Sequence, residues 1–161
     1  MRIGIDCTTV DQNYRGGGNT FIIGILNGLL KINNKHKFII FCKTENKSFF
    51  DFVIKDNRFK VLVLDTNELL RKSLISIPFI LNSRFLWKTS INLYNEITGI
   101  RKKVEMICDV LYTPTTLLNL YKLKIPKILS MHDILHHHYP EFFTFKENRV
   151  RRITFDISTY Y

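Results

Sequence analysis

Short apolar runs alternate along the chain with longer segments in which apolar residues recur every three or four positions. The runs are rich in Ile, Val, Leu and Phe and have strand lengths, which predicts that they are buried β-strands. They occupy residues 2–7, 38–42, 59–64, 109–113 and 125–132. From Phe21 to Leu30 the apolar spacing predicts a helix, and Asn19 or Thr20 could cap its start.

Further helices are expected at three places. Residues 48–54 and 145–161 show helical spacing, and another helix should begin at Glu68. Strands that alternate with helices are typical of βαβ units and a mainly parallel sheet. Because the strands are apolar almost throughout, helices should cover both faces of this sheet. No repeat or linker divides the chain, so the sequence predicts an α/β fold and a single domain over residues 1–161.

The composition adds a strong positive charge to this picture. Of 161 residues, 45% are hydrophobic and 13% aromatic, which indicates a globular domain with a sizeable core. The formal net charge is +10, so anionic partners are expected: nucleic acid, nucleotide phosphates or an acidic membrane face. No helix-turn-helix, RNP or zinc-finger pattern accompanies the charge, and we therefore expect no nucleic-acid partner.

The cysteines and the amino-terminal residues indicate a cytoplasmic protein. Cys7, Cys42 and Cys108 form no CxxC pair, so a structural zinc site is not expected. Cys7 and Cys42 stand in apolar runs, which favours buried thiols in a reducing compartment. The sequence shows no secretory signal and no apolar stretch of bilayer length. We therefore expect a cytoplasmic protein that could bind peripherally to the inner face of the plasma membrane.

Three consecutive glycines, Gly16, Gly17 and Gly18, separate the first predicted strand from the first predicted helix. Open parallel sheets bind ligands at the carboxyl ends of their strands, and a helix start offers free N–H groups to a phosphate. Glycine lacks the Cβ that would block a close approach. The spacing matches neither GxGxxG nor GxxxxGK[ST]. From the residues alone, a plain strand-to-helix turn and a ligand loop are equally compatible with this stretch.

His132 and Asp133 follow the last predicted strand, at the edge of the sheet where the glycine loop is also expected. An imidazole there could donate to a developing oxyanion or hydroxyl, although the spacing alone favours a structural histidine beside a capping aspartate. The neighbouring residues 136–138 are all histidines. Adjacent side chains cannot all point at one ion, so no metal site is expected.

Three segments resemble the acceptor-side domain of GT-B glycosyltransferases of family 4: RIGID at the start, then RGGGNTFIIGILNGLLK, and ILSMHDILHHHYPEFF near the end. Residues 49–104 carry no matching motif. The resemblance implies a Rossmann-like domain, the amino-terminal half of a GT-B fold. It also implies retaining transfer from a nucleotide sugar to a glycan or lipid-linked acceptor in cell-envelope polysaccharide synthesis. No metal or other cofactor is implied.

The same resemblance implies roles for individual residues. Gly17 and Gly18, in the loop from Gly16 to Asn19, would face the donor phosphates. His132 would lie near the reacting sugar, and Asp133 would hold the turn. Asn19 and the two residues after it stand where the family often carries Arg-Tyr.

The carboxyl end departs from the family pattern. The chain ends at Tyr161, inside what looks like the helix before the next family strand. We therefore expect a domain incomplete at its carboxyl end, with the donor domain missing or supplied by a partner chain, and no sugar transfer by this chain alone.

The segment 69–103 is strongly basic, because seven Lys or Arg residues against the single acid Glu96 leave a charge of +6. Its helical pattern should break or kink at Pro78. Basic and aromatic residues here suit a membrane-interface or acceptor surface. The candidates are Arg84, Trp87, Lys88, Arg101, Lys102 and Lys103. The alternatives are a core-covering helix with a solvated basic face and, for the whole chain, a non-catalytic module that docks on a membrane or a partner chain.

Overall fold

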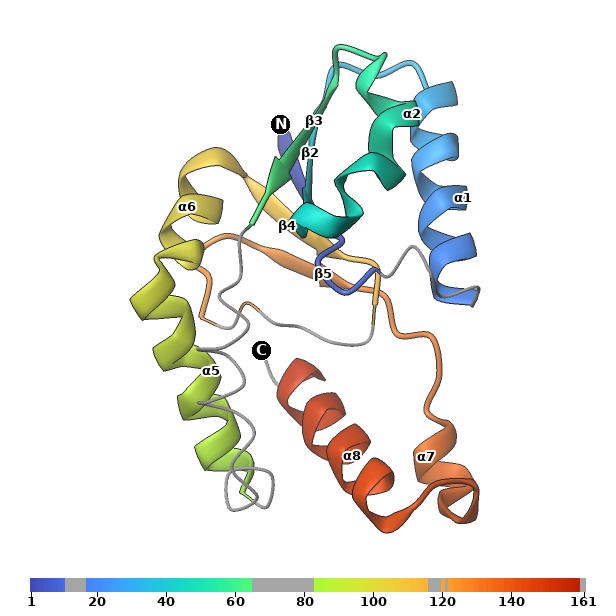
Figure 1. Ribbon diagram of the computed structural model, residues 1–161, viewed down its shortest axis with the longest axis vertical. Helices are drawn as coiled ribbons and strands as arrows, with labels where there is room; N and C mark the ends of the chain where they lie inside the picture. Colours follow the sequence, from blue (N-terminus) through green and yellow to red (C-terminus); the bar gives the residue numbers. More distant parts are fainter. Residues whose placement is uncertain (11–16, 65–82, 116–119, 121, 160–161) are drawn as a thin grey trace. The chain divides into compact units, whose positions relative to one another are not determined.

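The computed structural model describes residues 1–10, 17–64, 83–115, 120 and 122–159 (Figure 1). The chain divides into two compact units. Unit 1 comprises residues 1–65, 102–114 and 124–128, and unit 2 comprises residues 66–101, 115–123 and 129–161. The start of the helix expected at Glu68 and the kink expected at Pro78 lie outside the described residues.

A five-stranded sheet, all parallel, has the order β3-β2-β1-β4-β5. Its strands are β1 (Arg2–Asp6), β2 (Lys37–Cys42), β3 (Phe59–Val63), β4 (Val110–Thr113) and β5 (Lys127–Leu129). β1 pairs in parallel with β2 on one side and with β4 on the other. The direction of winding reverses between β1 and β4, which makes this pair the topological switch point. The predicted α/β, Rossmann-like class is confirmed.

The described helices follow the predicted ones closely. In unit 1 they are α1 (Gly17–Lys31), the 3-10 helix η1 (Thr44–Phe50), α2 (Asp51–Ile54) and most of α6 (Ile100–Ile107). In unit 2 they are α5 (Arg84–Thr98), α7 (Leu135–His138), the 3-10 helix η2 (Pro140–Phe142) and α8 (Phe145–Thr159). Two boundaries differ from the predictions. α1 begins at Gly17, so Asn19 and Thr20 lie within its first turn and do not cap it. The helix expected over residues 48–54 begins at Thr44 as a 3-10 helix and continues as α2, and the short helices α7 and η2 were not predicted.

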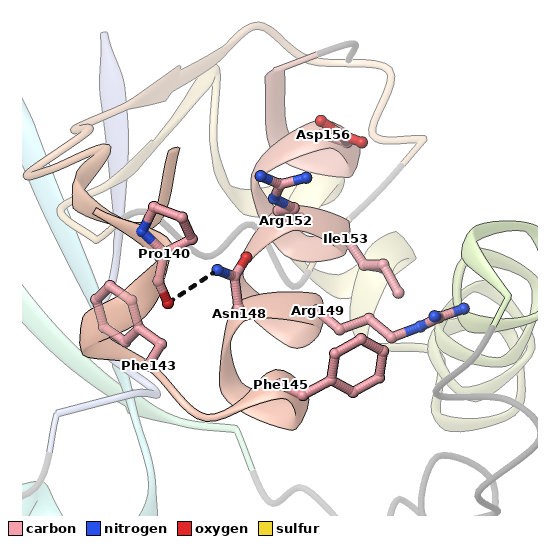
Figure 2. A pocket seen from close by; sticks show the side chains of 8 residues that line it. All are labelled: Pro140, Phe143, Phe145, Asn148, Arg149, Arg152, Ile153 and Asp156. Carbon is pink, nitrogen blue, oxygen red and sulfur yellow. Dashed lines mark hydrogen bonds between the residues drawn. The ribbon is translucent and has the colours of Figure 1, made fainter. Parts of the chain in front are cut away.

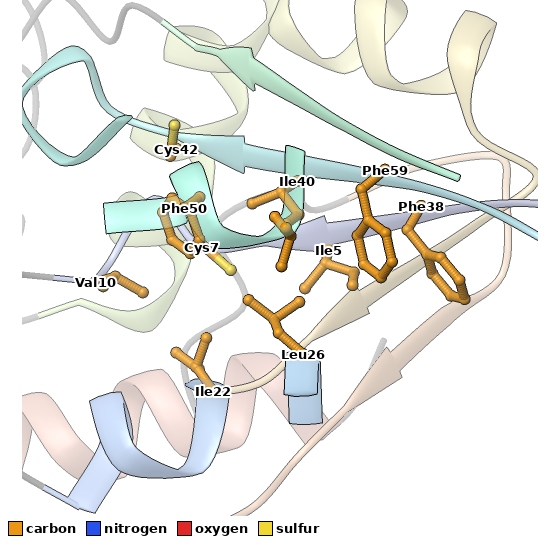
Figure 3. Packing of buried hydrophobic residues seen from close by; sticks show 11 residues of the cluster. Ile5, Cys7, Val10, Ile22, Leu26, Phe38, Ile40, Cys42, Phe50 and Phe59 are labelled. Carbon is orange, nitrogen blue, oxygen red and sulfur yellow. The ribbon is translucent and has the colours of Figure 1, made fainter. Parts of the chain in front are cut away.

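One face of the sheet packs against α1 and α2 (Figure 3). Alternate residues of each strand point to this face, because side chains of a strand alternate between its two sides. The cluster contains Ile5, Cys7, Val10, Ile22, Leu26, Phe38, Ile40, Cys42, Phe50, Val53 and Phe59. All three cysteines are buried and free, as the apolar runs around Cys7 and Cys42 predict. Burial raises the pKa of the Cys108 thiol to about 11.

The opposite face of β1 is packed so closely that it leaves no room for a side chain at Gly4. A Cβ there would lie 2.7 Å from the Sγ of Cys108, 2.9 Å from Phe41 and 3.1 Å from Leu111. Cys108 directly follows α6, Phe41 belongs to β2 and Leu111 to β4, and all three are buried. Glycine at this position therefore lets β1 occupy the centre of the sheet with both faces covered.

Arg58 joins the carboxyl end of α1 to the start of β3. Its guanidinium donates to the carbonyls of Ile32 at 2.6 Å and Leu30 at 3.1 Å. A cation at this end also complements the helix dipole. Asp56 fixes the guanidinium through an ion pair at 2.6 Å, and that contact lowers the pKa of the Asp56 carboxyl.

The last strand is shorter than the predicted range 125–132, since β5 covers only Lys127–Leu129. Pro126 has no N–H to give to the ladder, although its carbonyl accepts a hydrogen bond from Leu111 N at 2.9 Å. Beyond Leu129, residues 130–134 form no regular structure.

In unit 2, α5 and α8 pack through Ile91 and Ile157, with Trp87, Leu129 and Ile153 around them. The ends of α5 are well defined. The Ser83 Oγ accepts from Leu86 N at 3.3 Å, and Gly99 closes the helix in the left-handed conformation at φ 65°.

Replacing Gly4 with Ala should destabilise the chain by about 1–3 kcal/mol, because the new methyl group overpacks the contact with Cys108 and Phe41. Gly24→Ala is the matched control: a Cβ at Gly24 in α1 meets nothing within 4 Å, and Ala is the better helix former. Urea unfolding followed by circular dichroism measures both. Equal stability of the two variants would contradict the packing described for β1.

Candidate functional site

The switch point has a buried polar residue at the end of each of its two neighbouring strands. Asp6 is the last residue of β1 and Thr113 the last of β4, one step beyond the paired residues Ile5 and Tyr112. Asp6 is 2% exposed and Thr113 1% exposed, so both are removed from water at the sheet edge where such folds bind ligands. Both belong to unit 1.

The loop that leaves β1 is fixed by hydrogen bonds within it and by one from Asn46. The Oδ1 of Asp6 accepts from Thr8 N at 3.1 Å and from Thr8 Oγ1 at 2.6 Å. Val10 N donates to the carbonyl of Cys7 at 3.1 Å, and the amide Nδ2 of buried Asn46 donates to the carbonyl of Val10. The chain is therefore held in place as far as Val10, the last described residue before the glycines.

Thr113 differs from Asp6 because its Oγ1 is buried and has no hydrogen-bond partner among the described residues. A buried hydroxyl without a partner costs about 1–3 kcal/mol and is uncommon in folded proteins. Its place at the end of β4 makes it a candidate to meet a polar group of a ligand at the switch point.

Gly17 and Gly18 form the first residues of α1. A Cβ on either would meet no atom of the described residues within 4 Å, and among the described glycines only Gly99 has a positive φ. Within the described part of the chain, neither packing nor backbone conformation therefore requires glycine at these two positions. The first-turn N–H groups of α1 have no partners within the helix, and glycine lets a group approach them closely. Gly16 lies outside the described residues.

His132 and Asp133 lie in unit 2, after the end of β5, and both are exposed. The Asp133 Oδ1 accepts from Leu135 N at 3.2 Å, at the start of α7, and lies 3.9 Å from the guanidinium of Arg151. Asp133 thus fixes the turn into α7. Because His132 and the glycines belong to different units, their shared site stays a prediction.

Among the three consecutive histidines, only His136 is buried. Its ring lies edge-on to Phe155, with 5.5 Å between the ring centres, and neither ring nitrogen has a hydrogen-bond partner in the described part of the chain. Burial lowers the pKa of His136, and the positive charges of Arg151 and Arg152 and the neighbouring His137 lower it further. The described residues contain no group of three His, Cys, Asp or Glu side chains placed to hold a metal ion.

The six basic or aromatic candidates of the segment 69–103 fall into both units. Lys102 and Lys103 are exposed on the unit 1 part of α6, and Arg101 forms an ion pair with Glu96. Trp87 packs inward against the cluster of Ile91 and Ile157. The other two lie on α5, where Lys88 is half-buried and the side chain of Arg84 is outside the described part of the structure.

The exposed apolar residues of α5 are not among these six candidates. Phe85 is 74% exposed, Leu93 49% and Ile97 58%, and their spacing puts them on one face of the helix. No helix in the described ranges is both long and apolar enough to cross a bilayer.

Sequence reasoning did not single out Asp6 and Thr113. Each is the polar residue that closes an apolar strand, as in RIGID and VLYT, and this signal marks the carboxyl edge of a parallel sheet. The exposed stripe of Phe85, Leu93 and Ile97 on α5 was not among the predicted candidates either.

Comparisons with known protein families, with curated proteins and with solved structures find no match to this chain. The likeness to glycosyltransferases therefore rests on the motif residues themselves and on the Rossmann-like sheet.

The buried neutral His136 predicts a pH-dependent stability. The unfolded chain takes up a proton near the ordinary histidine pKa of 6.5, whereas the folded chain does so only at lower pH. Stability contributed by neutral His136 is therefore present above that value and is lost as the pH falls below it towards the lower pKa of the folded chain. Thermal unfolding across this range should show the loss in the wild type.

The loss should be smaller in His136→Phe, which keeps a ring against Phe155. His138→Phe removes an exposed imidazole from the same turn of helix and should retain the wild-type dependence. The same pH dependence in both variants would contradict the role assigned to His136.

Proposed function

We propose that the chain is the acceptor-side domain of a GT-B type glycosyltransferase, which transfers a sugar from a nucleotide-sugar donor to a glycan or lipid-linked acceptor. The observation that carries this proposal is the pair Gly17 and Gly18 at the start of α1. Neither the packing nor the backbone of the described residues needs glycine there, which is equally true of Gly24 and Gly28. Only Gly17 and Gly18 lie at the helix start, where a missing Cβ leaves the first-turn N–H groups open to a ligand.

The chemistry of sugar transfer suits this edge of the sheet. As the glycosidic bond to the donor breaks, the anomeric carbon gains positive character and the leaving diphosphate gains negative charge. Preorganised N–H groups at a helix start stabilise such charge, and the helix dipole adds about 0.3–1 kcal/mol at an exposed site. Gly17, Gly18 and Asn19 would supply these amides.

The motif resemblance adds His132 near the reacting sugar. Asp133, held by Leu135 N and near Arg151, would keep the histidine turn in place. The buried Thr113 hydroxyl supports the proposal as a polar group at the switch point that is without a partner among the described residues.

Gly17→Ala and Gly18→Ala should separate stability from binding. Each should raise stability by about 0.5–1 kcal/mol, because Ala is the better helix former. Each should also weaken the binding of a nucleoside diphosphate such as UDP, because the new methyl group blocks the amides. Gly24→Ala, in the exposed middle of α1, should stabilise in the same way and leave binding unchanged.

The measurement is the change in amide chemical shifts of residues 17–19 on titration with UDP, together with thermal unfolding. If these amides do not respond to UDP at millimolar concentration, or if Gly17→Ala and Gly18→Ala respond as Gly24→Ala does, the glycine pair is a plain turn and the proposal loses its support.

A second candidate is a non-catalytic module that docks on the inner face of an anionic membrane. The observation that favours it is the exposed stripe of Phe85, Leu93 and Ile97 on α5, in a chain of net charge +10. An amphipathic helix of this kind lies in the interface plane, and basic residues near anionic lipid contribute about 1 kcal/mol each.

Flotation with vesicles tests this candidate. The wild type should float with vesicles that contain phosphatidylserine and not with neutral ones. Replacing Phe85, Leu93 and Ile97 with Ser should abolish flotation, whereas Met106→Ser, at an exposed apolar residue of α6, should have little effect. Absence of binding to both vesicle types, or unchanged binding of the triple variant, would remove the membrane candidate.

A further inference from the structure

A cavity of about 580 Å³ lies along one face of α8 within unit 2 (Figure 2). Its lining comprises Pro140, Phe143, Phe145, Asn148, Arg149, Arg152, Ile153 and Asp156. Six of these residues recur along α8 at intervals of one, three or four positions and so share one face of that helix. The volume is within the range of small-molecule sites, about 300–1,000 Å³.

The frame of this cavity is held by hydrogen bonds at the start of α8. Thr144 and Glu147 form a capping box: Thr144 N donates to the Glu147 carboxylate at 2.9 Å, and Glu147 N donates to the Thr144 Oγ1 at 3.3 Å. Asn148 then bridges the helix to the preceding turn, because its Nδ2 donates to the carbonyl of Pro140 at 3.4 Å. The cavity wall formed by Pro140 is therefore tied to the helix.

The arginines of α8 differ in what they contact. Arg151 is occupied, since its Cζ lies 4.4 Å from the centre of the Phe143 ring and its guanidinium is 3.9 Å from Asp133. Arg152 lines the cavity, and no hydrogen bond or ion pair joins it to any of the described residues. Figure 2 shows its guanidinium between Pro140 and Asp156, with Asn148 one turn below. Arg152 is thus placed to bind an anion.

The other lining residues add an apolar part and a net positive charge. Phe143, Phe145 and Ile153 contribute apolar surface, and Phe145 is 81% exposed at one end of the cavity. Arg149 extends past Phe145 on that side (Figure 2). The two arginines outnumber Asp156, the one carboxylate in the lining. A flat or apolar group and an anion would both find partners here.

We propose that this cavity binds a phosphate ester whose organic part is aromatic or apolar, with the phosphate at Arg152 and the organic part against Phe145. Guanidinium binds phosphate through two parallel hydrogen bonds, and aromatic faces stack on flat groups. None of the glycines of α1 and neither His132 nor Asp133 lines the cavity, so this proposal does not rest on the proposed sugar transfer.

Titration calorimetry with three probes tests the site in the 161-residue chain. Naphthyl phosphate carries both features, naphthol only the ring and inorganic phosphate only the anion. Naphthyl phosphate should bind most tightly, and its affinity should fall as salt is added. Arg152→Gln should weaken it by about ten-fold or more, since hydrogen bonds to a charged group are the stronger ones.

Two further variants keep the outcome interpretable. Lys146→Gln removes a positive charge from an exposed position of α8 that does not line the cavity, and it should bind as the wild type does. Phe145→Ala truncates an exposed wall and should weaken naphthyl phosphate while leaving inorganic phosphate unchanged. Circular dichroism should show all variants folded, because each altered side chain is exposed.

The proposal is overturned if naphthyl phosphate does not bind, if naphthol binds equally well, or if Arg152→Gln behaves as Lys146→Gln does. An unchanged affinity of Phe145→Ala for naphthyl phosphate would also overturn it.

Vesicles with phosphatidic acid identify the source of the ester. Arg152-dependent binding to them supports a lipid phosphate, and Arg152-dependent binding of naphthyl phosphate alone supports a soluble one.

Discussion

The close packing around Gly4 is the constraint on which the described sheet depends. Cys108, Phe41 and Leu111 occupy the space that a Cβ of this residue would need, and only a missing side chain leaves room for them. β1 can therefore lie between β2 and β4 with both faces covered. This central position brings the ends of β1 and β4 together and buries Asp6 and Thr113 at the switch point. The position of the candidate site at the ends of β1 and β4 therefore depends on the close packing around Gly4.

Several residues at this edge are not the best choices for stability alone. A glycine in a helix costs about 0.5–1 kcal/mol relative to alanine, and α1 begins with two of them. The Thr113 hydroxyl is buried without a partner among the described residues. Functional sites are where local rules of stability are commonly broken. Packing requires glycine at Gly4. No contact with the described residues requires it at Gly17 and Gly18.

The strands were predictable because buried parallel strands are continuous apolar runs, and β1, β2, β3 and β4 begin and end within one residue of those runs. The start of α1 was predicted too late in the chain, because capping propensity favours Asn19 over a glycine as the first residue. The Arg58 clamp, the burial of His136 and the cavity beside Arg152 could not be predicted. Each depends on which side chains the fold brings together across turns, and a one-dimensional pattern holds no information on that.

The Arg58 clamp has a consequence for the order in which the chain assembles. It joins residues 26 to 28 positions apart, whereas Arg2 meets Asp109 across 107 positions. Loop closure favours the nearer contacts, so the first three strands with α1 can associate while β4 is still unpaired. Until β4 pairs with β1, the backbone N–H and C=O groups on that side of β1 are unpaired and can bond to another strand. During synthesis the middle of the future sheet is thus an edge, and the chain is then most exposed to association with its own copies.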